Sequence, residues 1–533
     1  MMKRLENIAH YGNYAVYVIV AIVGVAINFW TFNKCMVMAD DAWYLCLMRE
    51  LPSGINSSGH LLLFNVFNDN IFVIRIACYI LNIIAGGVFA LGLYLYSESW
   101  FVSDREKNSR PRMLIWVLLW LFVILAGQLR VITCPSFNYI TMNQIVTQFS
   151  LGLLLLSITR KSYVAMLFSG FFIAMLIPIM ITNIIFIPFV IVFIVLYTYT
   201  NDKASNWKSV SLRRIAVYIL GMILFLIMYF VFVEDIKTYL SIFLDKYNYT
   251  VSLGENDYGI KFLYKWLHRT MVFYFMQVVM LALILHYIPV LAARMNLHGK
   301  LSIIFMCVMF LAVVAYIRAA VNYDINFFLW LLAFYMFLDE KNVADRKKQL
   351  LFGLLVLVPI CLSFGTNNTF KDRGFEYMSF VTPLLFVCSV RWGHKLPVCI
   401  ALLLYALEMF TSLYLPTWHG DIYVEQDCSL KNIGIDQEIY VDSKTLDRLA
   451  FMQQHLSCGD TVWCDTENWG CVELLHLVPI SYDYRMNPDL VDSVDNVIVR
   501  RIDRYSRIIE HMDGKQDYKK YNYQNFVLYR KNE

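Results

Sequence analysis

The sequence predicts a polytopic α-helical membrane protein of about thirteen transmembrane helices, followed by a small extracytoplasmic α/β domain. Of its 533 residues, 59% are hydrophobic and only 16% are charged, whereas soluble chains are about a quarter charged. Apolar runs long enough to span a bilayer recur until about Pro416, and the composition then becomes polar. We therefore predict a transmembrane domain over residues 1–416 and a soluble domain over residues 417–533.

Each expected span is an apolar run bounded by polar or turn-forming residues. The basic residues Lys3 and Arg4 resemble the start of a signal peptide, but the apolar run is too long and no cleavage site follows. We therefore expect a retained first helix. Pro178 and Pro188 flank the boundary between the fifth and sixth spans, where a kinked or re-entrant arrangement is the alternative. The expected spans lie near residues 14–34, 70–96, 113–131, 141–159, 162–182, 184–200, 213–233, 267–289, 300–319, 324–338, 349–364, 376–391 and 396–415.

Basic residues between the spans predict the orientation, because cytoplasmic connections are enriched in Lys and Arg. The connections that follow even-numbered spans are all basic, and those that follow odd-numbered spans are acidic or mixed. The N-terminus is therefore expected in the cytoplasm, and an odd number of spans leaves the C-terminal domain outside. The basic connections cover residues 97–112, 160–161, 203–214, 294–300, 341–348 and 391–395.

The first external loop, about residues 37–70, carries the strongest functional signal. Asp40 and Asp41 follow the first span directly, and acids at a membrane boundary are costly and usually functional. A general base that acts on a hydroxyl group has to be a carboxylate or histidine held near the acceptor. Because adjacent side chains diverge, one acid can face the site while the other caps a helix that begins at Ala42.

The soluble domain alternates strand-like and helix-like runs. Strands are expected at residues 438–441, 461–464, 496–499 and 526–529, and helices at 443–456, 469–477 and 503–512. The domain also contains Cys428, Cys458, Cys464 and Cys471. Outside the cytoplasm these could form disulfides, and free buried thiols are the alternative, because pairing cannot be read from sequence.

The residues of the first loop resemble a known family. The segments Asp40–Tyr44 (DDAWY) and Arg49–Pro52 (RELP) resemble the first-loop signature of the GT-C superfamily of integral-membrane glycosyltransferases. The resemblance is to the branch of lipid A aminoarabinose transferases and protein O-mannosyltransferases. That branch has Asp-Glu where this chain has Asp40-Asp41, and a Lys/His-Pro-Pro motif where this chain has Ser57–His60.

The resemblance implies an inverting transfer of a sugar from a polyprenyl-phosphate carrier to an acceptor hydroxyl at the outer membrane face. Asp40 would be the general base and Asp41 the second candidate. The acceptor would be a lipid, a glycan or a protein, and the enzyme would act in cell-envelope glycan biosynthesis in a bacterial inner membrane. No cofactor is expected to be required. Whether the protein binds a divalent metal stays open, because some members of the superfamily use one, although no dense external acidic cluster exists beyond the pair.

Cationic and polar side chains at outward span ends are the expected substrate contacts. The leaving phosphate gains charge in the transition state, and fixed donors stabilise that charge strongly in a water-poor site. The alternative for each cation is an interfacial anchor or a contact to a membrane lipid. The candidates are His60, Arg130, Tyr139, His268, Arg269, Arg318, Tyr323, Lys371 and Arg373.

Two other functions compete with this one. A flippase or transporter for polyprenyl-linked glycans would carry ionisable residues at mid-membrane depth and an internal repeat. An O-antigen ligase or polymerase would carry one large external loop rich in Arg and His between late spans. A nucleic-acid partner is not expected, because the net charge is only +4 and basic clusters are few.

Overall fold

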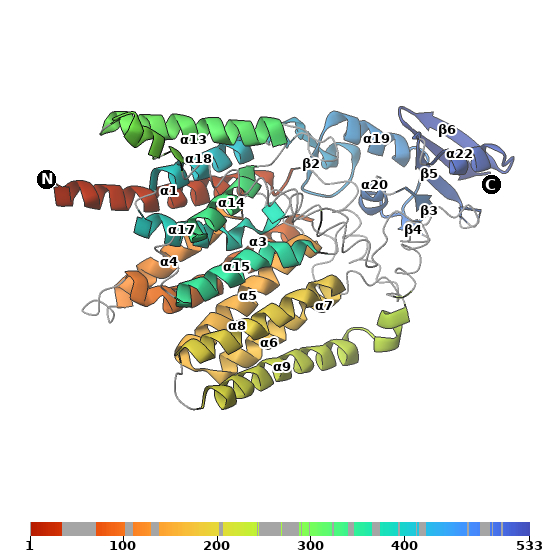
Figure 1. Cartoon of the computed structure of the whole chain (residues 1–533). Helices are drawn as coiled ribbons and strands as arrows, with labels where there is room; N and C mark the ends of the chain where they lie inside the picture. Colours follow the sequence, from red (N-terminus) through yellow and green to blue (C-terminus); the bar gives the residue numbers. More distant parts are fainter. Residues whose placement is uncertain are drawn as a thin grey trace. The chain divides into compact units, whose positions relative to one another are not determined.

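The structure is a computed structural model. It is mostly helical, and the strands of its described part lie in the C-terminal region (Figure 1). The residues that it describes are 2–34, 71–101, 110–128, 138–201, 206–241, 244, 268, 287–288, 290–297, 299–321, 325–338, 346–364, 374–392, 395–411, 413–414, 423–465, 468–479, 491–492, 494–502 and 505–532.

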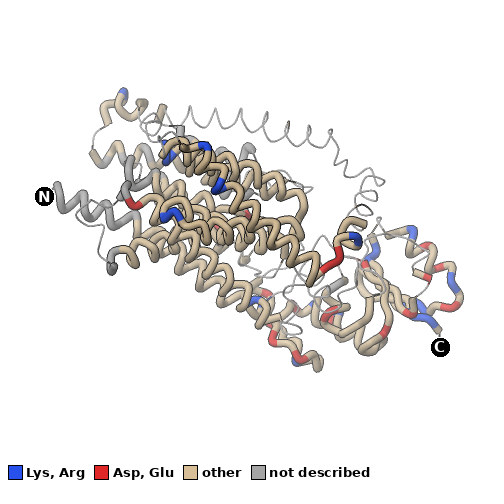
Figure 2. The backbone as a smooth tube through the Cα atoms, turned by 90° about the horizontal axis from the view of Figure 1, so that it is seen from below, with Lys and Arg blue, Asp and Glu red and all other residues tan. Residues whose placement is uncertain are grey.

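Helices occupy the predicted spanning ranges, apart from 267–289, most of which is outside the described residues. Charged residues in these helices lie mostly near helix ends (Figure 2). The helices are α1 (Met2–Thr31), α3 (Ile71–Phe101), α4 (Arg110–Ala126), α5 (Tyr139–Arg160), α6 (Tyr163–Ala174), α7 (Leu176–Ile179), α8 (Phe186–Asn201), α9 (Trp207–Phe232), α13 (Lys300–Val321), α14 (Ile325–Leu338), α15 (Arg346–Ser363), α17 (Thr382–Trp392) and α18 (Lys395–Thr411).

Within the described residues, five helices are long and apolar enough to cross a membrane. Three shorter apolar helices accompany them, at Met113–Ala126, Tyr163–Ile179 and Val398–Thr411. These findings agree with an integral membrane protein, and the full number of thirteen spans stays a prediction. The five long segments are Tyr14–Thr31, Ile71–Glu98, Tyr139–Arg160, Ile181–Asn201 and Trp207–Phe232.

The helix within the expected span 162–182 is broken. Helix α6 ends at Ala174, a short helix α7 follows, and Met180 is extended before the 3₁₀ turn η3 (Ile181–Ile185). Pro178 explains the break, because its ring clashes with the carbonyl four residues earlier, which belongs to Ala174. The kinked alternative is the arrangement observed.

Contacts among the described residues define two compact units. The membrane unit comprises the residues within Met1–Ile27, Ile80–Thr133 and Tyr139–Met409. The C-terminal unit comprises those within Asn28–Tyr79, Cys134–Asn138 and Phe410–Glu533. The end of α1 and the beginning of α3 thus belong to the same unit as the polar C-terminal region.

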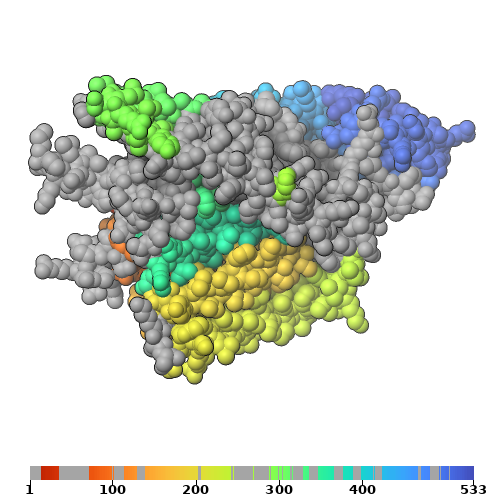
Figure 3. Space-filling view, in the orientation of Figure 1, coloured from red at the N-terminus to blue at the C-terminus, as the bar shows by residue number. Residues whose placement is uncertain are grey.

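The membrane unit contains a tightly packed group of helices, α5, α6, α8 and α9. Helices α8 and α9 lie side by side on the face seen in Figure 3. Glycine lets α6 and α9 approach closely, since a Cβ atom on Gly170 would lie 1.9 Å from the carbonyl oxygen of Tyr218. Helices α5 and α6 are joined by reciprocal bonds, in which Ser150 Oγ donates to Ser169 O at 2.9 Å and Ser169 Oγ to Ser150 O at 2.8 Å. Small residues at such contacts are typical of helices that associate in membranes.

The C-terminal unit contains a five-stranded sheet with strand order β4-β3-β5-β7-β6, which confirms a small sheet region at this end of the chain. The central strands are apolar on both faces, and α22 (Ser506–Asp513) packs Ile508 and Met512 against them. Strands β3 and β4 and strands β3 and β5 pair in parallel, and the remaining pairs are antiparallel. The strands of this sheet are β3 (Thr461–Cys464), β4 (Val478–Pro479), β5 (Asn496–Arg500), β6 (Tyr518–Tyr523) and β7 (Phe526–Lys531).

A smaller antiparallel sheet precedes it, formed by β1 (Cys428–Ser429) and β2 (Tyr440–Val441). The helices α19 (Ser443–Gln453) and α20 (Trp469–Leu474) coincide with predicted helices. Asp442 caps α19, because its Oδ1 accepts from the Thr445 amide at 2.9 Å. The expected strand at 438–441 is shorter in the structure, where it covers only Tyr440–Val441.

Candidate functional site

Most of the predicted site residues lie outside the described part of the chain, so their roles stay predictions. Of the three that are described, Tyr139 begins α5, Arg318 lies one turn before the end of α13, and His268 is exposed. The predicted residues outside the described part are Asp40, Asp41, His60, Arg130, Arg269, Tyr323, Lys371 and Arg373.

The chain is described as far as Lys34, six positions before Asp40, and Arg75 contacts its last described residues. Arg75 lies near the start of α3 and is only 1% exposed. Its Nη1 donates to the carbonyl oxygens of Phe32 and Lys34, both at 2.9 Å. These carbonyls follow the last turn of α1, where no further helical partner is available. The buried guanidinium therefore fixes the direction in which the chain leaves α1.

We call the contacts of Arg75 to the carbonyls of Phe32 and Lys34 the Arg75 clamp. Aromatic packing supports this clamp. Phe32 is buried, and its ring packs edge-on against Tyr79 of α3 at a centroid distance of 5.3 Å. Phe29, one turn earlier in α1, contacts the same tyrosine at 6.2 Å. Edge-to-face pairs at such distances add about 0.5–1.5 kcal/mol each beyond their burial.

The polar C-terminal region contacts residues 33–34 through backbone hydrogen bonding. The amide of Tyr440 in β2 donates to the carbonyl of Asn33 at 2.7 Å, and Lys34 forms a parallel bridge with Tyr440. Lys34 Nζ also donates to the carbonyl of Gln426 at 3.0 Å and lies 4.5 Å from the centroid of the Trp30 ring. The segment that leads to Asp40 is thus tied to α3 and to β2 within one compact unit.

The membrane unit holds a second feature, a buried carboxamide cluster made of Asn82 in α3, Gln128 just after α4, and Gln144 and Gln148 in α5. All four are 2% exposed or less. Gln128 Nε2 donates to Asn82 Oδ1 at 2.9 Å and to Gln148 Oε1 at 3.3 Å. Gln144 Nε2 reaches the same Asn82 oxygen at 3.4 Å. Three helices thus direct uncharged polar groups to one interior position.

A neighbouring pair extends this polar character along α5 to the 3₁₀ turn η3. Asn183 Nδ2 donates to Asn143 Oδ1 at 2.8 Å. Among the described residues, several atoms of these amides, including Gln128 Oε1, Gln144 Oε1 and Gln148 Nε2, have no hydrogen-bond partner. Buried amides with spare donors and acceptors are costly.

Sequence reasoning did not select the carboxamide cluster. The signal was present, since Gln144 and Gln148 are four residues apart and lie on one face of an otherwise apolar helix. Tyr139, a predicted substrate contact, is one turn ahead of Asn143 on the same helix. Within the described residues no group of three or more His, Cys, Asp or Glu side chains could hold a metal, so the need for a metal stays open.

The four cysteines of the soluble domain are free thiols in the structure. Cys464 and Cys471 are close enough to interact electrostatically, and burial raises the pKa of the Cys464 thiol well above its ordinary value. Burial likewise raises the pKa of Cys471 to about 11. Both thiols are therefore protonated at neutral pH and behave as packing groups. The alternative of free buried thiols is met only in part, because Cys471 is buried, Cys428 and Cys464 are half-buried, and Cys458 is exposed.

Comparisons with known proteins identify no family for this chain. Neither a protein-family model nor a curated protein matches it. Among solved structures it is similar to the oligosaccharyltransferase of Archaeoglobus fulgidus, crystallised with zinc and sulfate. The similarity covers 97% of this chain and 73% of that chain, with 12% sequence identity and a TM-score of 0.47. Function is therefore inferred from the residues of this chain.

Proposed function

We propose that the protein is an integral-membrane glycosyltransferase that moves a sugar from a polyprenyl-phosphate carrier to an acceptor hydroxyl outside the cytoplasm. Asp40 is the proposed general base, and Asp41 is the second candidate. The acceptor hydroxyl loses its proton to the carboxylate while its oxygen attacks the anomeric carbon, and the lipid phosphate leaves from the opposite face. The configuration at that carbon is therefore inverted.

One observation carries the proposal: the segment that leads to Asp40 is held by a buried arginine and by β2. A catalytic base has to be positioned to within a fraction of an ångström, which requires a rigid support. Arg75 and the Tyr440 amide supply fixed contacts to residues 32–34, a few positions before the acids. An acidic pair that served only as a helix cap or a surface charge would not need such a support.

The carboxamide cluster of the membrane unit bears on the choice between an enzyme and a flippase. Amides donate and accept hydrogen bonds without carrying charge. A transporter would instead be expected to use ionisable groups at mid-membrane depth. In the described helices the interior polar network around Asn82 is made of amides, and this favours the enzyme over the flippase.

The experiment is a transfer assay on the full chain in proteoliposomes with a labelled polyprenyl-phosphate sugar and lipid acceptors. An enzyme releases polyprenyl phosphate, whereas a flippase moves the intact carrier. We expect Asp40→Asn to lower the rate by roughly 10²–10⁴-fold, the usual contribution of a general base. Asp41→Asn should lower it less.

Asp69→Asn is the matched control, because it neutralises another acid of the same predicted loop and should leave the rate near that of the unaltered protein. Folding of each variant is checked by its thermal unfolding midpoint. Full activity in both Asp40→Asn and Asp41→Asn would refute the assignment of the base. Transport of the carrier without release of polyprenyl phosphate would refute the enzyme itself.

A further inference from the structure

A pocket lies at the opposite end of α5 from Tyr139, between the ends of three helices. Its volume is about 370 Å³. It is formed where α5 ends, where α6 begins and where α9 begins, and these ends belong to the connections predicted to face the cytoplasm. Nine described residues line it, and none of them is acidic: Ser157, Lys161, Ser162, Tyr163, Met166, Asn206, Trp207, Val210 and Arg214.

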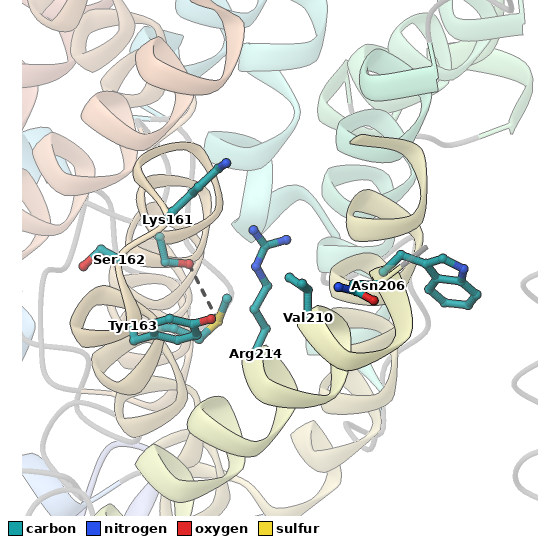
Figure 4. Close-up of a pocket in the computed structure, with 9 residues that line it drawn as sticks. Lys161, Ser162, Tyr163, Asn206, Val210 and Arg214 are labelled. Carbon is teal, nitrogen blue, oxygen red and sulfur yellow. Dashed lines mark hydrogen bonds between the residues drawn. The ribbon is translucent and has the colours of Figure 1, made fainter. Parts of the chain in front are cut away.

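Arg214 is the buried cation of the pocket. It is 7% exposed, and its Nη1 donates to Thr198 Oγ1 at 2.8 Å. Thr198 is itself fixed, because its hydroxyl donates to the carbonyl of Ile194 at 2.8 Å. One nitrogen of the guanidinium is thus tethered to α8, while the side chain as a whole lines the cavity (Figure 4).

Lys161 is the second cation, and its backbone is strained. Its φ is 53°, in the left-handed region that a residue with a side chain rarely adopts. It terminates α5, where the Ser162 amide donates to the carbonyl of Ser157 at 3.0 Å. Glycine is the usual residue at such a helix end. The Lys161 side chain is exposed, and Figure 4 shows the side chains of Lys161 and Arg214 extending in a similar direction.

Helix geometry adds further donors. The N-termini of α6 and α9 both border the pocket, so their first amide groups bring partial positive charge to it. Neither helix has an acidic residue in its first turn. Ser162 Oγ accepts from the Ala165 amide of α6, whereas Asn206 makes no capping bond from its side chain at the start of α9. The two cations and the start of α9 make this pocket complementary to an anion.

The surroundings of the pocket are apolar. Val164 and Phe168 of α6 are 66% and 46% exposed, and Leu212 of α9 is 68% exposed. These large side chains lie within two turns of the lining residues. Leu212 is on a helix long and apolar enough to cross a membrane, and Val164 and Phe168 are on a shorter apolar helix. We propose that the pocket binds the phosphate headgroup of an anionic phospholipid, with the acyl chains lying along α6 and α9. Basic pockets between helices at the cytoplasmic surface are suited to such headgroups.

The test uses the full chain purified in mild detergent, with retained lipid counted by native mass spectrometry. Titration with phosphatidylglycerol is compared with phosphatidylcholine, and inorganic phosphate is added as a competitor. Three variants are measured: Arg214→Gln, Lys161→Gly and the matched control Arg213→Gln. Arg213 is the exposed neighbour of Arg214 in α9, so its replacement removes the same charge at the same depth.

We expect phosphatidylglycerol to be preferred, and Arg214→Gln and Lys161→Gly to weaken its binding by roughly fivefold or more. Arg213→Gln should bind like the unaltered protein. Lys161→Gly should not lower the thermal unfolding midpoint, because glycine relieves the strained backbone. Weaker lipid binding in that variant is therefore not explained by misfolding.

Two outcomes would overturn the proposal. Equal weakening by Arg213→Gln and Arg214→Gln would mean that lipid is attracted by general surface charge. Equal retention of the two phospholipids, together with tight binding of inorganic phosphate, would make the pocket a site for a free anion. Neither outcome depends on whether the protein transfers a sugar.

Discussion

At the scale of single residues, Arg75 organises the exit of the first helix. Its guanidinium supplies donors to two backbone carbonyls that have no other helical partner. Arg75 lies within the expected span 70–96, and only the fold shows that it contacts the backbone just after α1. The buried charge of Arg75 therefore serves to position the backbone of residues 32–34.

Replacement of Arg75 by leucine should destabilise the protein by roughly 3 kcal/mol, because two carbonyls lose charge-assisted hydrogen bonds in a buried position. Arg75→Lys keeps the charge but not the planar donor geometry, so it should lose less. The thermal unfolding midpoint of the purified full chain measures both. An unchanged thermal unfolding midpoint in Arg75→Leu would show that the hydrogen bonds of Arg75 do not stabilise the protein.

Asp492 provides a prediction about pH. Its side chain accepts hydrogen bonds from His511 at 2.7 Å and Lys515 at 3.0 Å, and these contacts hold its pKa below the ordinary value of 3.8. Since the folded-state pKa is depressed, the stabilisation is fully present above pH 3.8 and is lost as the pH falls below that value.

We therefore expect Asp492→Asn to weaken the C-terminal sheet region at neutral pH and to flatten the acid limb of its unfolding curve. The effect should be small and should shrink further in high salt, because the pair is partly exposed. Hydrogen exchange in α22 between pH 3 and 7 gives the measurement. Identical pH profiles for the variant and the unaltered protein would contradict the linkage.

At the scale of elements, the pair α6–α9 depends on close backbone approach. A Cβ atom on Gly221 would come within 1.9 Å of the carbonyl oxygen of Leu167. This contact also sets the separation of the helix ends that form the pocket around Arg214. Packing of this kind involves residues about fifty positions apart in sequence, such as Gly170 and Gly221, so no local pattern reveals it.

The expected result of Gly221→Ala is a loss of about 1–3 kcal/mol, since the helices have to separate to admit the methyl group. Gly87→Ala in α3 is the control, because nothing lies within 4 Å of the added Cβ. It should be neutral or stabilising by up to about 1 kcal/mol, the helix preference of alanine over glycine. Thermal unfolding compares the two variants directly, and equal midpoints would argue against the close approach.

At the scale of the whole molecule, the C-terminal region and the end of α1 belong to one compact unit. A backbone hydrogen bond from the Tyr440 amide to the Asn33 carbonyl connects the two. The C-terminal region therefore contacts residues 33–34, ahead of the loop proposed to carry the base.

Tyr440→Pro removes the amide donor, and Tyr440→Ala keeps it while removing a side chain that is 37% exposed. We expect the proline variant to lose most transfer activity and the alanine variant to keep it. Hydrogen exchange of residues 31–34 gives a readout that is independent of activity, and it should rise only in the proline variant. Equal exchange in both variants would show that the bond does not hold the segment.

The sequence by itself determined the class of fold. Hydrophobic composition and run length indicated the helices, because a bilayer imposes a fixed length and polarity on each span. Alternating patterns predicted β3, β5 and β7 to within two residues. Strand β6 was missed because its sequence, YKKYNY, is polar and lysine-rich, as edge strands often are.

Only the tertiary structure decided which distant groups meet. The Arg75 clamp, the carboxamide cluster and the basic pocket each join residues from separate elements. Their formation depends on helix packing, which places side chains by geometry that no single segment encodes. Local propensity and hydropathy predict elements, whereas a site requires several elements to converge. The acidic pair at Asp40 and Asp41 therefore remains a prediction from sequence, and the fold adds the contacts to residues 32–34.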